Sequence, residues 1–398
     1  MTADTTETET KSELGSKDLG DGENEGVKAS KHDFVPGEKE SKDLINVKEL
    51  TGVLLINLGT PDSFSPSDVA RYLKQFLTDP FVIDIPALPR YALVYGIIAP
   101  FRAKKSAAMY KKIWLGNGQS PLLYYSKLLT DKVASSLGEE FDVKLAMRYG
   151  SPSVASQLIA FREAGVKKIL VQPLFPQYAL ATFKSAAEKV DVEAKRLGMR
   201  DAVVHLPPYF ADGGFIEAET SKLAGKMKEL SPDHVVFTFH GLPVRHCKKT
   251  EKLRPGEASR CGTDGCCDVF ETRNEDCYRA QCVQTAKAIA KGLSLGEADY
   301  TVAFQSRFGK DPWIEPYTDK TLEELKKAGK KKVMVVSPSF AVDCLETLEE
   351  VGIGLKEDFE QDYDGTLIVE PCLNDDEKFA KFLAGKVKVR ANAEAAQS

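Results

Sequence analysis

Apolar runs alternate with stretches of helical periodicity from about residue 50 to residue 390. Eight runs rich in Val, Ile and Leu predict β-strands at 53–58, 143–148, 168–172, 201–206, 234–239, 299–305, 332–337 and 366–370. Helical patterns between them predict helices at 65–78, 151–163, 179–197, 214–230, 277–292, 319–327, 344–356 and 375–389. Most of the strands are apolar on both faces, which is typical of parallel strands covered by helices in an α/β protein.

Eight β/α units fit either one closed barrel or two open sheets. A repeat favours two sheets, because residues 164–175 (AGVKKILVQPLF) and 328–340 (AGKKKVMVVSPSF) both run from a helix end through a strand to a proline. We therefore predict two Rossmann-like domains, each a parallel four-stranded sheet flanked by helices, with the functional cleft between them. The predicted domains span 47–206 and 207–374. Residues 375–398 would form a C-terminal helix that returns to the first domain, followed by a short tail.

Two segments interrupt this rhythm. Residues 1–46 hold 12 Asp or Glu against 6 Lys, a net charge of −6, and predict a disordered acidic tail. Residues 79–113 are apolar and aromatic, and they close with basic side chains (Arg102, Lys104, Lys105, Lys111 and Lys112). This stretch is either a helical insertion packed on its own domain or an exposed apolar lip with a basic rim, able to touch a membrane surface or an apolar ligand.

Composition narrows the class of protein. The net charge of −5 gives no indication of nucleic-acid binding. No run approaches the ~20 apolar residues of a membrane span, and the first residues lack a secretory pattern, so we expect a cytoplasmic protein without routine disulfides. The sequence GTDGCC lacks the Lys of a phosphate loop and NLGTP lacks dinucleotide-binding spacing, which disfavours a nucleotide cofactor.

One histidine and a group of carboxylates are candidates for chemistry. His240 ends an apolar strand in FTFHGLP, where a neutral imidazole could accept a proton or bind a metal, or simply bond a neighbouring backbone carbonyl. Asp343, Glu346 and Glu350 lie close together in SFAVDCLETLEEVG and suit a divalent cation or proton transfer. Alternatively, Asp343 and Glu346 form a capping box and Glu350 is solvated. We expect the neighbouring Glu349 to face solvent.

Five of the eight cysteines fall within 22 residues: Cys261, Cys266, Cys267, Cys277 and Cys282. Four thiolates in so short a span can hold an iron–sulfur cluster or a structural zinc ion. No histidine follows at zinc-finger spacing, and which four of the five would be ligands stays open. We expect Cys247, Cys344 and Cys372 to be ordinary small residues.

Nine segments together resemble the ferrochelatase family: LLINLGTPDS (54–63), MYKKIW (109–114), GQSPLLYYSK (118–127), MRYGSPS (147–153), PLFPQYALAT (173–182), FTFHGLP (237–243), FQSRFG (304–309), PWIEP (312–316) and SFAVDCLETLEE (339–350). The resemblance implies an enzyme that inserts ferrous iron into protoporphyrin IX, the last step of haem biosynthesis, with the porphyrin clamped between two Rossmann-like domains and no nucleotide. A coproporphyrin ferrochelatase or another metal–tetrapyrrole chelatase is the alternative. A haem-binding sensor is disfavoured, since a pure binder needs no proton acceptor.

The same resemblance implies roles for individual residues. His240 would accept pyrrole protons or bind the incoming iron, Glu346 would face it, and Asp343 and Glu350 would continue the chain of acids. Residues implied to line the macrocycle or orient the histidine are Leu58, Ser126, Arg148, Tyr149, Gln305, Trp313 and Phe340. The cysteine segment 261–282 resembles a bacterial subgroup with an internal 2Fe–2S cluster, and the lip 79–113 matches a segment that meets the membrane. The acidic tail departs from the family, and the oligomeric state stays open.

Overall fold

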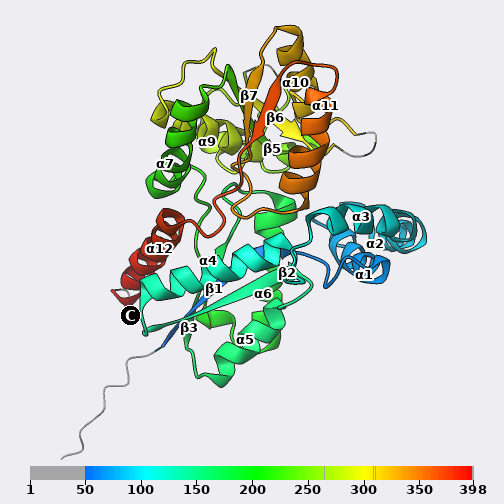
Figure 1. Ribbon diagram of the computed structural model, residues 1–398. Coiled ribbons are helices and arrows are strands. Elements are labelled where there is room, and N and C mark those ends of the chain that lie inside the picture. Colours follow the sequence, from blue (N-terminus) through cyan, green and yellow to red (C-terminus); the bar gives the residue numbers. More distant parts are fainter. Residues whose placement is uncertain (1–49, 264, 308, 310, 397–398) are drawn as a thin grey trace, which may run out of the picture. The chain divides into compact units, whose positions relative to one another are not determined.

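The strands of the chain form two separate parallel sheets of four strands each (Figure 1). The structure is a computed structural model that describes residues 50–396 except 264, 308 and 310, so the predicted tail at 1–46 lies outside it. The first sheet has the order β2-β1-β3-β4 and is made of β1 (Thr51–Gly59), β2 (Phe141–Tyr149), β3 (Lys168–Pro173) and β4 (Val203–His205). The second has the order β6-β5-β7-β8 and is made of β5 (His234–His240), β6 (Tyr300–Gln305), β7 (Lys332–Val336) and β8 (Thr366–Val369). This confirms the predicted α/β fold and excludes the barrel, which would join all eight strands in one closed sheet.

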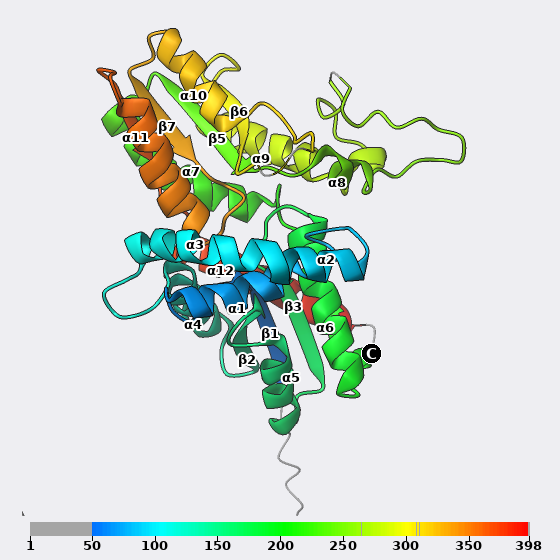
Figure 2. The same ribbon diagram turned by 90° about the vertical axis from the view of Figure 1, so that its right-hand side faces the viewer.

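Each sheet is built around a strand that is buried on both faces. In β1, Val53 and Leu55 point into one apolar core while Leu54 and Ile56 point into another, as the twofold periodicity of a strand requires. Helices α4 (Pro121–Leu137) and α12 (Glu377–Ala395) supply side chains to the first core, and α5 (Val154–Glu163) and α6 (Ser185–Arg196) supply them to the second (Figure 2). The apolar character that predicts the strand therefore also fixes a helical layer on either side of it.

The second sheet is layered in the same way. The core on one face takes side chains from α7 (Gly213–Leu230) and α9 (Tyr278–Gly292). The core on the other face takes them from α10 (Thr318–Lys327), α11 (Lys356–Glu360) and the helical turns that precede α11. The C-terminal helix α12 contacts α4, α7 and β3, so it touches helices that accompany both sheets. The domain limits derived from the sequence stay predictions.

Two predicted helices differ from the regular α-helix expected. The helix expected at 179–197 begins as a π-helical turn, Leu180–Lys184 (η2), before α6. The helix expected at 344–356 is π-helical over Glu346–Leu355 (η5) and continues as α11. A π-helix has a wider turn than an α-helix, with i→i+5 hydrogen bonds, and it is frequent at functional sites. Glu346 and Glu350 both lie in this π-helical segment. The apolar periodicity of the sequence predicts a helix here but does not distinguish a π-helix from an α-helix.

The insertion at 79–113 is helical. It contains α2 (Ala87–Leu93), a π-helical turn at Val94–Ile98 (η1) and α3 (Ala99–Ile113), and its inner face packs on α1 (Pro66–Leu77). Ser65 caps α1, and Pro66 occupies its first position. Among the described residues, none of the helices combines the length and the apolar character needed to cross a membrane.

A buried carboxyl group on α7 makes the stability of the fold depend on pH. Burial raises the pKa of Glu219, which is 5% exposed, to about 7 from an ordinary value of 4.5. Between pH 4.5 and about 7, the carboxyl is therefore mostly neutral in the folded chain but mostly ionised in the unfolded chain. The contribution of Glu219 to the free energy of unfolding is therefore fully present below about pH 4.5, and it is lost as the pH rises through 7.

We expect Glu219→Gln to remove this loss. The free energy of unfolding of the variant, relative to wild type, should rise by about 2–3 kcal/mol between pH 4.5 and pH 8. Urea unfolding at the two pH values measures the difference. Glu229→Gln, an exposed position on the same helix, is the matched control and should show no such trend. Parallel pH profiles for wild type and Glu219→Gln would contradict the prediction.

Candidate active site

His240 ends β5, the strand that pairs with both β6 and β7 in the second sheet. Its Nδ1 lies 2.6 Å from the carbonyl oxygen of Gly241. Because a carbonyl can only accept, Nδ1 carries the proton, and Nε2 of the neutral ring keeps a free lone pair. The two alternatives for this histidine are therefore compatible, since one ring nitrogen makes the structural bond and the other can bind a proton or a metal.

The turn after His240 requires a glycine. The amide of Gly241 donates to the carbonyl of Gln305 at 2.7 Å, and a Cβ at this position would lie 2.7 Å from the same oxygen. That Cβ would also lie 3.2 Å from the ring of Trp313, which the sequence predicted to line the site. The absence of a side chain thus lets β6 and Trp313 approach the end of the histidine strand.

Two other predicted residues lie beside the histidine. The ring of Phe340 is 6.4 Å from that of His240, in an edge-on arrangement, and Ser339 Oγ lies 3.4 Å from the His240 amide. Gln305 is buried, pairs with His240 across the sheet, and its Nε2 lies 3.5 Å from the carbonyl oxygen of Glu346. The histidine strand is therefore linked to the start of η5 through Gln305 of the neighbouring strand β6.

Glu346 and Glu350, both half-buried, lie one turn apart on η5. Burial raises the pKa of Glu350, and the nearby charge of Glu346 adds to the rise, while His240 opposes it. Glu350 thus interacts electrostatically with both Glu346 and His240. Ser306 Oγ donates to Glu350, and Ser306 holds a φ of 67°, a conformation that a serine rarely adopts.

Asp343 has different surroundings from the two glutamates. It is 3% exposed, and its carboxylate accepts from Thr347 Oγ1 (2.8 Å), Asn374 Nδ2 (2.7 Å) and the Cys372 amide (3.2 Å). These donors occupy the carboxylate and connect the start of η5 to the segment after β8. The predicted capping partner, Glu346, is not among these donors.

The expectation that Glu349 faces solvent is wrong. Glu349 is 8% exposed, and its carboxylate bonds Lys112 Nζ of α3 at 2.8 Å. The reason is tertiary, because α3 of the insertion packs against η5 and covers this side of the turn. Lys112, predicted as part of a basic rim, is therefore also a bridge between the insertion and the acidic segment.

A buried carboxylate missed by the sequence analysis holds two of the predicted ring-lining residues together. Asp79 accepts hydrogen bonds from Arg148, Tyr149 and Ser185, and only 1% of its side chain is exposed. The Arg148 guanidinium also lies 4.4 Å from the centre of the Tyr149 ring. The only sequence signal for Asp79 is its position at the junction between helix 65–78 and the apolar insertion.

Leu58 and Ser126 lie on either side of Asn57. The Leu58 amide donates to Asn57 Oδ1 at 2.8 Å, and Asn57 Nδ2 donates to Ser126 Oγ at 3.1 Å. Ser126 is fully buried, whereas Leu58 is half-buried. Ser126 can therefore act on a bound ligand only through its neighbours on β1.

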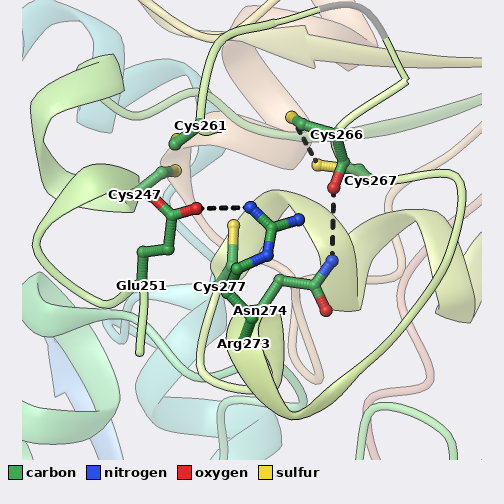
Figure 3. Close-up of a pocket in the computed structure, with 8 residues that line it drawn as sticks. All are labelled: Cys247, Glu251, Cys261, Cys266, Cys267, Arg273, Asn274 and Cys277. Atoms are coloured by element: carbon green, nitrogen blue, oxygen red, sulfur yellow. Dashed lines mark hydrogen bonds and ion pairs between the residues drawn. The ribbon is translucent and has the colours of Figure 1, made fainter. Parts of the chain in front are cut away.

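A second site gathers five thiols around one pocket (Figure 3). Its lining residues are Cys247, Cys261, Cys266, Cys267 and Cys277, together with Glu251, Arg273 and Asn274. Cys247, expected to be an ordinary small residue, belongs to this pocket because the short helix α8 (Val244–Lys248) brings it there. Cys282 is fully buried inside α9 and is not one of the lining residues.

The thiols perturb one another. Burial, with Cys277 and Cys266 nearby, raises the pKa of Cys261 to about 12. Contact with the Cys247 thiol raises the pKa of Cys277 to about 12. The Sγ atoms of Cys266 and Cys267 lie 3.5 Å apart. A positive centre would reverse this effect, because thiols deprotonate when they bind a metal.

Cysteine thiols are the main donor groups around this pocket. Within the described residues, His, Cys, Asp and Glu side chains form no group of three or more that could hold one metal ion. An iron–sulfur cluster is larger and takes four cysteine thiolates, which need not converge on one point. Five sulfurs around one pocket provide that number with one to spare.

The outer face of the insertion is apolar and exposed. Leu88 and Phe101 are 84% and 79% exposed, and Tyr91, Tyr95 and Ile97 are about half exposed. The inner face is buried at Ala103, Ala107 and Tyr110. Both sequence-based interpretations of 79–113 therefore describe part of it, since one face packs on α1 and the other forms an exposed apolar lip.

Known proteins match most of the chain. The family model described as ferrochelatase matches residues 50–391, which include the histidine strand, the acidic segment and the cysteine pocket. A ferrochelatase of Coxiella burnetii is 46% identical over 337 residues, covering 85% of this chain and 93% of that protein. A ferrochelatase of Legionella pneumophila is 43% identical over 333 residues (83% and 96%), and one of Bdellovibrio bacteriovorus is 41% identical over 337 residues (85% and 98%).

Proposed function

The chain belongs to the ferrochelatase family, whose members insert iron into a porphyrin in haem biosynthesis, and we propose that it inserts ferrous iron into protoporphyrin IX with His240 as the proton acceptor. The observation that carries this proposal is the hydrogen bond from His240 Nδ1 to the Gly241 carbonyl. It leaves Nε2 as the basic atom, at the carboxyl end of a central strand where α/β proteins bind ligands.

The reaction exchanges two pyrrole protons for one Fe²⁺ ion, so the site must remove protons without holding the metal too tightly. Nε2 of His240 takes a pyrrole proton as a general base. Glu350 is suited to take up a proton in turn, because burial raises its pKa and makes its neutral form easier to reach. Glu346, the first residue of η5, is the candidate for meeting the ferrous substrate.

Asp343 has a supporting role in this proposal. Its carboxylate already accepts from three protein donors, so it fixes the start of η5 rather than meeting iron directly. The sequence-based proposal that Asp343 is an iron ligand is therefore the less favoured one. In this proposal, Glu346 and Glu350 are the residues of the acidic segment that face His240.

The proposed porphyrin-lining residues are Leu58, Arg148 and Tyr149 of the first sheet, Gln305 of the second, and Trp313 and Phe340 from the loops after β6 and β7. Ser126 of α4 is fully buried and would act through Asn57. Arg148 and Tyr149 act together, because Asp79 and Ser185 hold both side chains. Gln305, Trp313 and Phe340 surround the turn after His240, and they would orient the porphyrin ring against Nε2 of His240.

We expect His240→Ala to lower kcat for iron insertion by at least about 100-fold, the usual contribution of a general base, while protoporphyrin still binds. Anaerobic assays with Fe²⁺ follow the loss of porphyrin fluorescence, and the same fluorescence measures binding. His205→Gln, a histidine of the first sheet bonded to Asp191, is the matched control and should retain activity.

The same assay separates the alternative substrates. Coproporphyrin and Co²⁺ are offered in parallel with protoporphyrin IX and Fe²⁺. Turnover only with coproporphyrin, or only with cobalt, would replace the proposed substrate by the alternative. An active His240→Ala enzyme would exclude His240 as the base.

We further propose that the cysteine pocket holds a 2Fe–2S cluster. Cys247, Cys261 and Cys277 would be three of its ligands, with Cys266 or Cys267 as the fourth. A bound cluster would cross-link α8, the loop 261–267 and the start of α9, and it could also exchange an electron. The raised pKa values of the thiols support a site that needs a positive centre to form thiolates.

Cys247→Ser and Cys282→Ser discriminate between the ligand sets that the sequence and the structure favour. We expect Cys247→Ser to lose the bound iron, the sulfide and the visible absorption of the cluster, and Cys282→Ser to keep them. Anaerobic purification followed by metal analysis measures this without reference to activity. Equal loss in the two variants, or retention in Cys247→Ser, would contradict the assignment of Cys247.

We also propose that the exposed lip docks on a membrane surface. Burying Leu88 and Phe101 in the interface would contribute roughly 1.5–3 kcal/mol each. We therefore expect Leu88→Glu/Phe101→Glu to lower liposome binding at least tenfold in sedimentation assays. Val389→Glu, which changes an exposed apolar residue on α12, is the control. Unchanged sedimentation of the double variant, or equal loss in Val389→Glu, would rule out docking through the lip.

A further inference from the structure

Asp84 connects the first residues of the lip to the short helix that carries Cys247. It lies in the segment before α2, and its side chain is 13% exposed. Its Oδ1 accepts from Arg245 Nη2 at 2.8 Å and from Arg245 Nε at 3.2 Å, while Lys249 Nζ donates to Oδ2. Arg245 belongs to α8 and Lys249 is its C-cap residue, so both donors come from one helical turn 161–165 residues away in the sequence.

Several basic side chains interact with the Asp84 carboxylate. Burial by itself would raise the pKa of Asp84, but hydrogen bonds from Arg245 and Lys249 hold it well below its usual range. His246, which is 4% exposed, adds a third basic side chain with its Nε2 at 3.4 Å from Asp84 Oδ2. Arg245, His246 and Lys249, all on or beside one helical turn, therefore face a single carboxylate. Asp311 also bonds Arg245 from the other side.

Helix α8 cannot position itself. It has five residues, and isolated helices of that length are unstable because helix nucleation is costly. Its place must come from tertiary contacts. These are Asp84 on the lip side, Cys247 in the thiol pocket, and the Val244 amide bonded to the Pro312 carbonyl at 2.9 Å.

We propose that Asp84 is a positioning residue that latches the lip to α8, so that the order of the lip depends on how Cys247 is held in the thiol pocket. The inference rests on the proposed cluster in that pocket. The helix that follows His240 by four residues would then link three places: the cluster pocket, the histidine strand and the exposed apolar lip. Loss of the cluster frees Cys247, lets α8 shift, and loosens residues 79–98 without altering the catalytic groups.

Hydrogen–deuterium exchange of the full-length, cluster-loaded protein tests the latch. Asp84→Asn and Arg245→Gln each break it directly, and Arg245→Gln is the second variant because that side chain is partly exposed and tolerates change. We expect either to speed exchange across 79–98 at least tenfold and to raise the porphyrin KM several-fold, with kcat within twofold of wild type. A merely structural role would lower the amount of folded enzyme without this split between KM and kcat.

Coupling to the pocket is tested by Cys247→Ser, alone and combined with Asp84→Asn. We expect Cys247→Ser to speed exchange across 79–98, and the double variant to exchange no faster than the faster single variant. Cys372→Ser, a buried cysteine outside the pocket, is the control and should leave 79–98 unchanged. Faster exchange at 261–277 in Cys247→Ser with no change at 79–98 would overturn the coupling.

The two proposals fail in different ways. If the protein holds no iron or sulfide, the cluster is wrong, and the exchange of Asp84→Asn still decides whether the latch exists. If the cluster is present but Asp84→Asn and Arg245→Gln leave exchange at 79–98 unchanged, the latch is wrong while the cluster stands.

Discussion

The close approach of Gly241 to the Gln305 carbonyl is the constraint on which the catalytic half of the molecule depends. It ends the histidine strand next to β6 and leaves no room for a side chain at the turn. The same turn presents the Gly241 carbonyl to His240 Nδ1 and thereby selects the ring tautomer. It also directs the chain toward Pro243 and α8, so the thiol pocket and the lip contact both follow from how this strand ends.

Buried carboxylates divide into two groups according to how many donors reach them. Asp79, Asp84 and Asp343 each accept several hydrogen bonds, many of them from segments distant in the sequence. An ionised carboxylate can be buried only when such donors replace its water, so these three hold the structure together. Glu346 and Glu350 are half-buried on a π-helical segment, and burial raises the pKa of Glu350. They are the carboxylates for which we propose proton and metal chemistry.

The lip is held from two sides by charged side chains. Lys112 bonds Glu349 beside the acidic segment, and Asp84 bonds the helix beside the thiol pocket. Its apolar outer face takes no part in these contacts and stays exposed at Leu88 and Phe101. The inner face of the segment packs on α1, so its position is fixed by an apolar core as well as by these ion pairs.

The sequence by itself determined the eight strands, the two-sheet fold and the helices that alternate with the strands, because strand and helix periodicities are local. It did not predict α4 (Pro121–Leu137) or the short helix α8. It also made His240 and the acidic segment candidates for the site, since residues that end parallel strands share one edge of a sheet. The tertiary structure alone decided which carboxylates are occupied by donors, that Glu349 is covered by α3, and that Cys247 rather than Cys282 lines the thiol pocket. Donors from segments 69 to 161 residues away decide the state of a buried charge, and no local pattern encodes such distant partners.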